Sequence, residues 1–230
     1  MVDTNPPSIS TTECVAGVTG APYALETWAA RGFSQFGADG ILHKLFSDIK
    51  TTNKYFVEFG TQDGMQCNTR RLRETCGWSG LLMDGGHDNA AINLHREFIT
   101  QGNILSLLAK YGVPKTFDLL SVDIDGNDFH VLKKILTVHV PRVIVVETNF
   151  QVLRSVTIRY HPKHRWDGTC YGSASVAAFE KLLSPLGYSR VASYLPDTYW
   201  VHSRTVPHSQ YTVRNISTNR CHPSHAWEVV

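Results

Sequence analysis

The stretch Tyr55-Phe-Val-Glu-Phe-Gly-Thr-Gln-Asp-Gly64 decides the fold, because it joins an apolar segment directly to a glycine-containing turn. Residues 55–59 read as a buried strand, since a strand covered on both faces of a parallel sheet is apolar almost throughout. Glu58, Gly60 and Gly64 then fit the pattern acid-x-Gly-x-x-x-Gly. Glycine has no Cβ, so a turn built on it lets the backbone approach a ligand closely. The stretch therefore predicts the first strand of an α/β sheet followed by a ligand-binding turn.

The composition is that of an ordinary globular protein. The chain has 230 residues, of which 42% are hydrophobic and 18% charged, and this length is enough for one sizeable core. We expect a single domain over residues 1–230, with an irregular arm at 1–33 and a polar tail at 204–230. The net charge of +2 is too small to indicate nucleic-acid binding. No apolar run reaches the roughly 20 residues that a membrane helix needs. Neither nucleic acid nor a membrane is expected as a partner.

The cysteines favour a reducing compartment. They are odd in number and widely spaced, at Cys14, Cys67, Cys76, Cys170 and Cys221. Reduced thiols fit this distribution better than a disulfide framework. The N-terminal residues show neither the basic nor the apolar segment of a secretory signal. We therefore predict a cytoplasmic protein and interpret the glycosylation sequon at residues 215–217 as a chance match.

Helical and strand-like periodicities alternate through much of the chain, which is typical of parallel βαβ units with helices on both faces of a sheet. Helices are predicted over residues 38–49, 68–76, 89–98, 104–111 and 129–136, and strands over 55–59, 78–83, 98–100, 117–124 and 142–146. After a polar loop at 150–172, the pattern predicts a helix at 175–183 and a hairpin of strands 188–194 and 198–202. The expected fold is a mostly parallel, Rossmann-like α/β sheet that ends in an antiparallel hairpin.

Polar residues follow the predicted strands at the points where the strands end. Ligands bind at this edge of an α/β sheet. Asp84 ends the second strand roughly 20 residues beyond Asp63, a spacing at which an acid can accept hydrogen bonds from both ribose hydroxyls. Asn103-Ile104 follows the third strand and suits an adenine edge and face. The residues expected to bind a nucleotide-type cofactor are Glu58, Gly60, Asp63, Gly64, Asp84, Asn103, Ile104 and Asp123.

Two strand ends also predict a metal site. Asp123 and Glu147 end strands that should be adjacent, and Asn149 follows closely. Two carboxylates and an amide oxygen form an all-oxygen set, which suits Mg²⁺ better than zinc. The alternative is that Glu147 pairs with a base such as Arg142 and no metal binds.

The candidate general bases are Asp125 and His161. Asp125 belongs to a crowded group of carboxylates, and an imidazole such as that of His161 titrates near neutral pH. The competing interpretation is that Asp125 and Asp128 cap the next helix. His161 and His164 have the spacing of a metal pair, but no Cys or acid partner stands nearby, which favours exposed histidines.

Together these motifs resemble the FkbM-type S-adenosylmethionine-dependent methyltransferases, whose enzyme class uses the acid-x-Gly-x-x-x-Gly turn. The resemblance runs over residues 34–201. It rests on the opening stretch, on Gly77-Trp-Ser-Gly-Leu-Leu-Met-Asp84, on Asn93-Leu-His-Arg-Glu-Phe-Ile-Thr100, on Phe117-Asp-Leu-Leu-Ser-Val-Asp-Ile-Asp-Gly-Asn-Asp128 and on residues 141–149.

The resemblance implies a class I methyltransferase fold, with a seven-stranded sheet whose last strand is antiparallel. It also implies methyl transfer to an oxygen of a sugar or secondary metabolite. The chain departs from the commoner pattern after Asp84, where Gly85-Gly86-His87 replaces a proline-containing turn. Carried over by position, the residues that line the cofactor pocket would be Glu58, Gly60, Asp84, Ile104 and Asp123.

The sequence thus predicts a methyltransferase with S-adenosylmethionine and Mg²⁺ as ligands and a small-molecule acceptor as its partner. One alternative is a nicotinamide-dependent oxidoreductase, against which the missing G-x-G-x-x-G and the C-terminal hairpin argue. Another is a non-catalytic cofactor-binding module, against which the intact strand-end acids argue. The oligomeric state stays open, and a homo-oligomer is compatible with the sequence.

Overall fold

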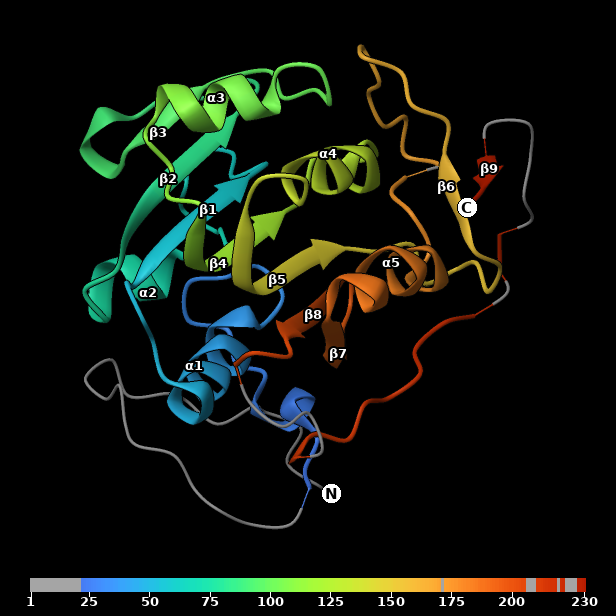
Figure 1. The fold of residues 1–230 in the computed structure, drawn as a ribbon, viewed down its shortest axis with the longest axis horizontal. Coiled ribbons are helices and arrows are strands. Elements are labelled where there is room, and N and C mark those ends of the chain that lie inside the picture. The colour runs from blue at the N-terminus through green and yellow to red at the C-terminus, as the bar shows by residue number, and fades with distance from the viewer. Residues whose placement is uncertain (1–21, 171, 206–209, 219, 222–226) are drawn as a thin grey trace.

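The computed structural model describes residues 22–170, 172–205, 210–218, 220–221 and 227–230 (Figure 1). A seven-stranded sheet forms its centre. The strand order is β3 (Leu94–Arg96), β2 (Ser79–Asp84), β1 (Tyr55–Phe59), β4 (Thr116–Val122), β5 (Val140–Glu147), β8 (Asp197–His202) and β7 (Tyr188–Tyr194). The strands from β3 to β5 run parallel, whereas β8 runs antiparallel to both of its neighbours. This is the expected class I methyltransferase topology, and the structure confirms it.

Helices cover both faces of the sheet (Figure 1). α1 (Ala38–Ile49) and α2 (Arg70–Thr75) pack on one face, and α3 (Ile104–Lys110), α4 (Asp128–Ile135) and α5 (Val176–Leu183) pack on the other. Successive strand residues point to opposite faces, so Phe56 joins the first apolar layer and Val57 the second. Because both faces are covered, the strands read as continuous apolar runs. The described 3₁₀ segments are η1 (Leu25–Trp28), η2 (Ala90–Ile92) and η3 (Ser184–Leu186).

The predicted elements are present except after β2. The helix expected at 89–98 and the strand expected at 98–100 are wrong, because η2 and β3 occupy residues 90–96. Asn89 caps η2 by accepting a hydrogen bond from the Ala91 N–H, and Asn93 ends it with a φ of 55°. From Leu94 the chain pairs with β2. Pairing with the sheet here overrides the helical periodicity.

A second, two-stranded sheet was not predicted. β6 (Val156–Ile158) lies in the expected loop at 150–172 and pairs antiparallel with β9 (Trp227–Val229) of the tail. The disulfide between Cys170 and Cys221 joins the same two segments. Periodicity within one short segment carries no information about a partner this distant in the chain.

The disulfides contradict the prediction of reduced thiols. Cys76 is disulfide-bonded in addition to the Cys170–Cys221 pair, whereas Cys67 is free and buried. Cys14 lies outside the described residues. Disulfides persist in oxidising environments, so the cysteine argument for a cytoplasmic location is wrong.

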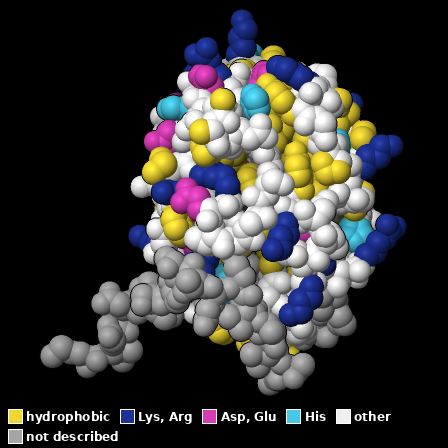
Figure 2. All heavy atoms as spheres, turned by 90° about the vertical axis from the view of Figure 1, so that its left-hand side faces the viewer, with side chains coloured by type: hydrophobic (Ala, Val, Ile, Leu, Met, Phe, Trp, Pro, Cys, Tyr) yellow, Lys and Arg dark blue, Asp and Glu magenta, His cyan; other side chains and the backbone are white. Residues whose placement is uncertain are grey.

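The face of the molecule in Figure 2 carries scattered charges. Among the residues drawn in colour, Lys and Arg side chains are spread over this face rather than gathered into one patch (Figure 2). None of the described helices combines the length and the apolar character needed to cross a bilayer.

Candidate cofactor and catalytic site

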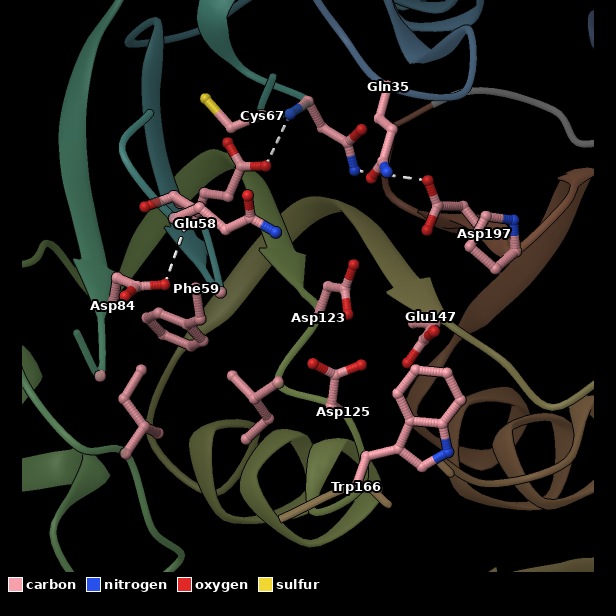
Figure 3. Close-up of a pocket in the computed structure, with 18 of the residues that line it drawn as sticks. Gln35, Glu58, Phe59, Cys67, Asp84, Asp123, Asp125, Glu147, Trp166 and Asp197 are labelled. Carbon is pink, nitrogen blue, oxygen red and sulfur yellow. Dashed lines mark hydrogen bonds between the residues drawn. The ribbon is translucent and has the colours of Figure 1, made fainter. Parts of the chain in front are cut away.

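A cavity of about 720 Å³ opens at the carboxyl ends of the parallel strands (Figure 3). Glu58 of β1, Asp84 of β2, Asp123 after β4 and Glu147 of β5 all line it. The topology therefore brings together the strand-end acids that the sequence singled out. Lining residues that the sequence analysis did not assign to the site include Gln35, Phe36, Asn68, Phe98, His164, Trp166 and Asp197.

The turn after β1 is held against the end of β4. Gly60 has a φ of +71°, and a Cβ at this position would lie 1.5 Å from the carbonyl oxygen of Asp123. No larger residue fits there, so glycine is required for this close approach. Gly64 has a φ of +80° and packs on Ile92, but it is not among the cavity-lining residues.

Glu58 shapes this turn from inside the sheet. Its buried carboxylate accepts hydrogen bonds from the N–H of Asn68 at 2.7 Å and from the N–H and Oγ1 of Thr69 at 3.0 and 2.5 Å. Burial raises the pKa of Glu58, although these donors oppose the rise. The carboxylate therefore ties β1 to the start of α2, and its open side faces the cavity.

Asp84 is fixed as an ionised carboxylate at the end of β2. Its oxygens accept hydrogen bonds from the N–H groups of Gln62 at 2.9 Å, Gly86 at 2.7 Å and His87 at 3.1 Å, and His87 Nδ1 lies 2.9 Å away. Burial alone would raise the pKa of Asp84, but these contacts outweigh it and the pKa is lowered. The Gly85-Gly86-His87 turn, which departs from the family pattern, thus supplies donors that orient this carboxylate.

A group of crowded carboxyls lies at the wall of the cavity, where Asp123 and Glu147 line it and Asp128 is fully buried beside them. Asp123, Asp128 and Glu147 each offer an oxygen, and these three atoms lie within 4.8 Å of one another. Burial and the negative charges of neighbouring carboxylates, Asp125 among them, raise the pKa of Asp123, raise that of Asp128 to about 6, and raise that of Glu147 to about 9. No Lys or Arg is among the described residues that line the cavity. A bound cation would relieve this repulsion.

Asn149 does not join this group. Its Nδ2 donates to the carbonyl oxygens of Cys170 at 2.7 Å and Gly172 at 3.0 Å, and its Oδ1 accepts from the N–H of Gln151 at 3.0 Å. The amide is therefore committed to the backbone at Cys170 and Gly172. Asp128 stands where an amide oxygen was expected.

The structure also tests the two alternatives that were open for these acids. Arg142 forms its ion pair with Asp118 at 2.6 Å, so it is not the base that neutralises Glu147. Asp128 accepts from the N–H groups of Ile124 at 2.8 Å and Gly126 at 2.7 Å, so it does bind the loop that leads into α4.

Asp125 and His161 lie in different environments. Asp125 lines the cavity, has a φ of 54° and is exposed, and partial desolvation raises its pKa. His161 does not line the cavity, and its Nδ1 accepts from the N–H of Lys163 at 3.2 Å. His164 lines the cavity instead, and burial lowers its pKa.

Besides Gly64, three predicted cofactor residues lie outside the cavity lining. Asp63 is exposed and accepts from the N–H of Met65 at 3.0 Å. Asn103 accepts from the N–H of Thr100 at 2.7 Å and donates to the carbonyl of Phe98 at 2.8 Å, so its amide stabilises the turn before α3. Ile104 is fully buried in the core.

Phe98 and Ile99 line the cavity where an adenine pair was expected. These two residues were not predicted as cavity residues, because the third strand was expected over residues 98–100, whereas β3 ends at Arg96. Asp197 was missed as well, although an acid opening the apolar strand 197–202 was a visible signal.

Comparison with known proteins leaves the geometry as the main guide to function. No protein-family description matches the chain, and no curated protein is similar to it. Among solved structures, an O-methyltransferase family protein from Burkholderia thailandensis is similar over 64% of this chain and 49% of its own, with 10% identity and a TM-score of 0.39. The chain thus spans about half the length of that protein. A likeness this distant carries no argument about activity.

Proposed function

We propose that this protein is an S-adenosylmethionine-dependent methyltransferase of the FkbM type that acts on a hydroxyl oxygen of a small molecule. One observation carries the proposal: an acidic cavity lies at the carboxyl edge of a sheet with class I methyltransferase topology, and none of its described lining residues is Lys or Arg. The acidic residues that line it are Glu58, Asp84, Glu97, Asp123, Asp125, Glu147 and Asp197.

The charge of the cavity discriminates between cofactors. A dinucleotide brings an anionic pyrophosphate, which these carboxylates would repel. S-adenosylmethionine brings a sulfonium and an ammonium, which they would attract. The lining residues favour one orientation of this cofactor. Asp84 would accept hydrogen bonds from the ribose hydroxyls, Phe98 and Ile99 would contact the adenine, and Asp123 would lie beside the sulfonium.

The chain's own task in methyl transfer is alignment and proton removal. When bound, S-adenosylmethionine supplies an electrophilic methyl group. The residues around it must hold the acceptor hydroxyl in line with that group and exclude water. Asp125 is the proposed base, because it lines the cavity and its raised pKa makes it a stronger base than a freely solvated carboxylate.

The crowded carboxyls also fit a divalent cation. Asp123, Asp128 and Glu147 form an all-oxygen set of the kind that Mg²⁺ prefers. A cation there would acidify the acceptor hydroxyl by polarising its oxygen. This would lessen the need for a base and would neutralise the repulsion that raises the three pKa values.

Calorimetric titration tests the cofactor assignment. We expect S-adenosylmethionine to bind and NADH not to bind under the same conditions. Incubation with radiolabelled methyl donor and a pool of hydroxylated metabolites then tests catalysis. Binding of NADH alone would support an oxidoreductase, and binding without methyl transfer to any acceptor would support a non-catalytic module.

Chelation tests the metal separately. We expect EDTA to abolish turnover, Mg²⁺ to restore it and Glu147→Gln to mimic the chelator, with cofactor affinity changing far less. Elemental analysis must show that chelation stripped the protein. Full activity in the stripped protein would remove the metal and leave Asp125 as the sole proton acceptor.

A further inference from the structure

Asp197 borders the cavity on the side opposite Asp84 (Figure 3). It opens β8, lies beside Glu147 in the sheet register and is only 3% exposed. Asp84 marks the proposed ribose position, so Asp197 lies at the end of the cavity where the other end of the cofactor would reach.

The carboxylate of Asp197 is poorly satisfied by the protein itself. Its hydrogen-bond partner among the described residues is Asn68, whose Nδ2 lies 3.4 Å from Oδ2 and also donates to Ser121 Oγ at 3.2 Å. No described Lys or Arg forms an ion pair with it. Burying a carboxylate without a positive partner is costly, so this position favours a ligand that brings a cation.

Glu58 provides the contrast within the same end of the cavity. It is equally buried, but three N–H and O–H donors from Asn68 and Thr69 satisfy it. Glu58 therefore already has a structural role, whereas Asp197 offers an acceptor that no cation of the described chain occupies.

Amide side chains complete this end of the cavity. Gln35 lies close to Asp197 (Figure 3), and its backbone N–H donates to the backbone carbonyl of Gln66 at 3.1 Å. Both residues line the cavity. Amide N–H groups are donors for a carboxylate. An unsatisfied carboxylate beside such donors is complementary to an amino-acid group, which carries an ammonium and a carboxylate on one carbon.

We propose that Asp197 binds the α-ammonium of the cofactor's aminoacyl group, with the amides of Gln35 and Gln66 receiving its carboxylate. This rests on the proposed function, since it takes the cofactor to be S-adenosylmethionine. The β7–β8 hairpin would thereby contribute to cofactor binding.

A ligand pair that differs only in the ammonium tests the assignment. Calorimetry would compare S-adenosylhomocysteine with its deaminated analogue in the wild type, in Asp197→Asn and in Asp84→Asn. In the wild type the deaminated analogue should bind about ten- to hundredfold more weakly, as expected for hydrogen bonds to a charged group. Asp197→Asn should abolish this difference by weakening only the ligand with the ammonium. Asp84→Asn should weaken both ligands equally and preserve the difference.

Every other result of these titrations overturns either the assignment of Asp197 or the proposed function. Equal weakening of both ligands by Asp197→Asn, or no weakening, would overturn the assignment while leaving the proposed function intact. Failure of the wild type to bind either ligand would overturn the proposed function itself, and the assignment with it. If Asp197→Asn does not fold, Asp197→Ser is measured in its place with the same ligands and the same criterion.

Discussion

Two acids at the opposite ends of strand β4, Asp118 within it and Asp123 directly after it, have opposite surroundings. At the amino end, Asp118 is fully buried, pairs with Arg142 at 2.6 Å and accepts from the N–H groups of residues 52–54 at 2.8 to 3.0 Å. Burial alone would raise its pKa, but these partners lower it. At the carboxyl end, the neighbours of Asp123 are other carboxyls, and its pKa is raised. The fold therefore supplies Asp118 with partners, whereas at Asp123 it brings further carboxyls together.

The largest expected effect is a loss of stability when Asp118, at the amino end of β4, is replaced. Asp118→Asn should lower the free energy of unfolding by about 3–5 kcal/mol, because it leaves the Arg142 guanidinium without its partner. The matched change Asp123→Asn should leave the free energy of unfolding unchanged or raise it, because it removes a repelled charge. Urea denaturation followed by circular dichroism measures both. A loss at Asp123 as large as that at Asp118 would break the comparison.

The next effect tests an acid that is satisfied by backbone donors yet open to the cavity. Asp84→Ala should weaken S-adenosylmethionine binding by about 1.5–3 kcal/mol, the contribution of hydrogen bonds to a charged group. The thermal unfolding of the variant serves as the control that it remains folded. An unchanged dissociation constant in the folded variant would remove Asp84 from the ribose role.

The smallest effect is a slope in the pH dependence of stability. The pKa of Asp197 rises from 3.8 to about 7 on folding, so the folded state holds a proton that the unfolded chain has released. The stabilisation is complete below pH 3.8 and is lost as the pH rises through about 7. Glu58 on β1 and Glu147 on β5 face Asp197 and act in the same direction.

Replacing this group should flatten the slope. In the ligand-free protein, the free energy of unfolding of Asp197→Asn should fall less steeply with pH than that of the wild type. The difference between the two slopes is at most about 1.4 kcal/mol per pH unit. Denaturant titrations at a series of pH values measure it, and parallel curves would show that Asp197 does not titrate in this range.

The sequence predicts the fold well because the sheet is built from local signals. Continuous apolar strands, alternating helices and the 188–202 hairpin all appear in short windows, and the structure confirms them. The third strand fails because its β character depends on pairing with β2. The pairing of β6 with β9 and the Cys170–Cys221 disulfide depend on contacts between distant segments, which no short window contains.

The candidate site was predicted only where it coincides with a strand end. Glu58, Asp84, Asp123 and Glu147 meet because parallel strands end at one edge. Asn149 was expected among them, but its amide bonds to the backbone of the following loop. Trp166 and Asp197 reach the cavity from the loop and the hairpin. Their positions follow from how these segments fold back over the sheet.

A crystal structure with bound S-adenosylhomocysteine tests the central claim most directly. The account predicts that the ribose hydroxyls lie within hydrogen-bond distance of the Asp84 carboxylate. The ligand sulfur should lie beside Asp123, facing Asp125 and Glu147, and the ammonium should lie against Asp197. A ligand that binds outside this cavity, or one whose ribose lies away from Asp84, would contradict the account.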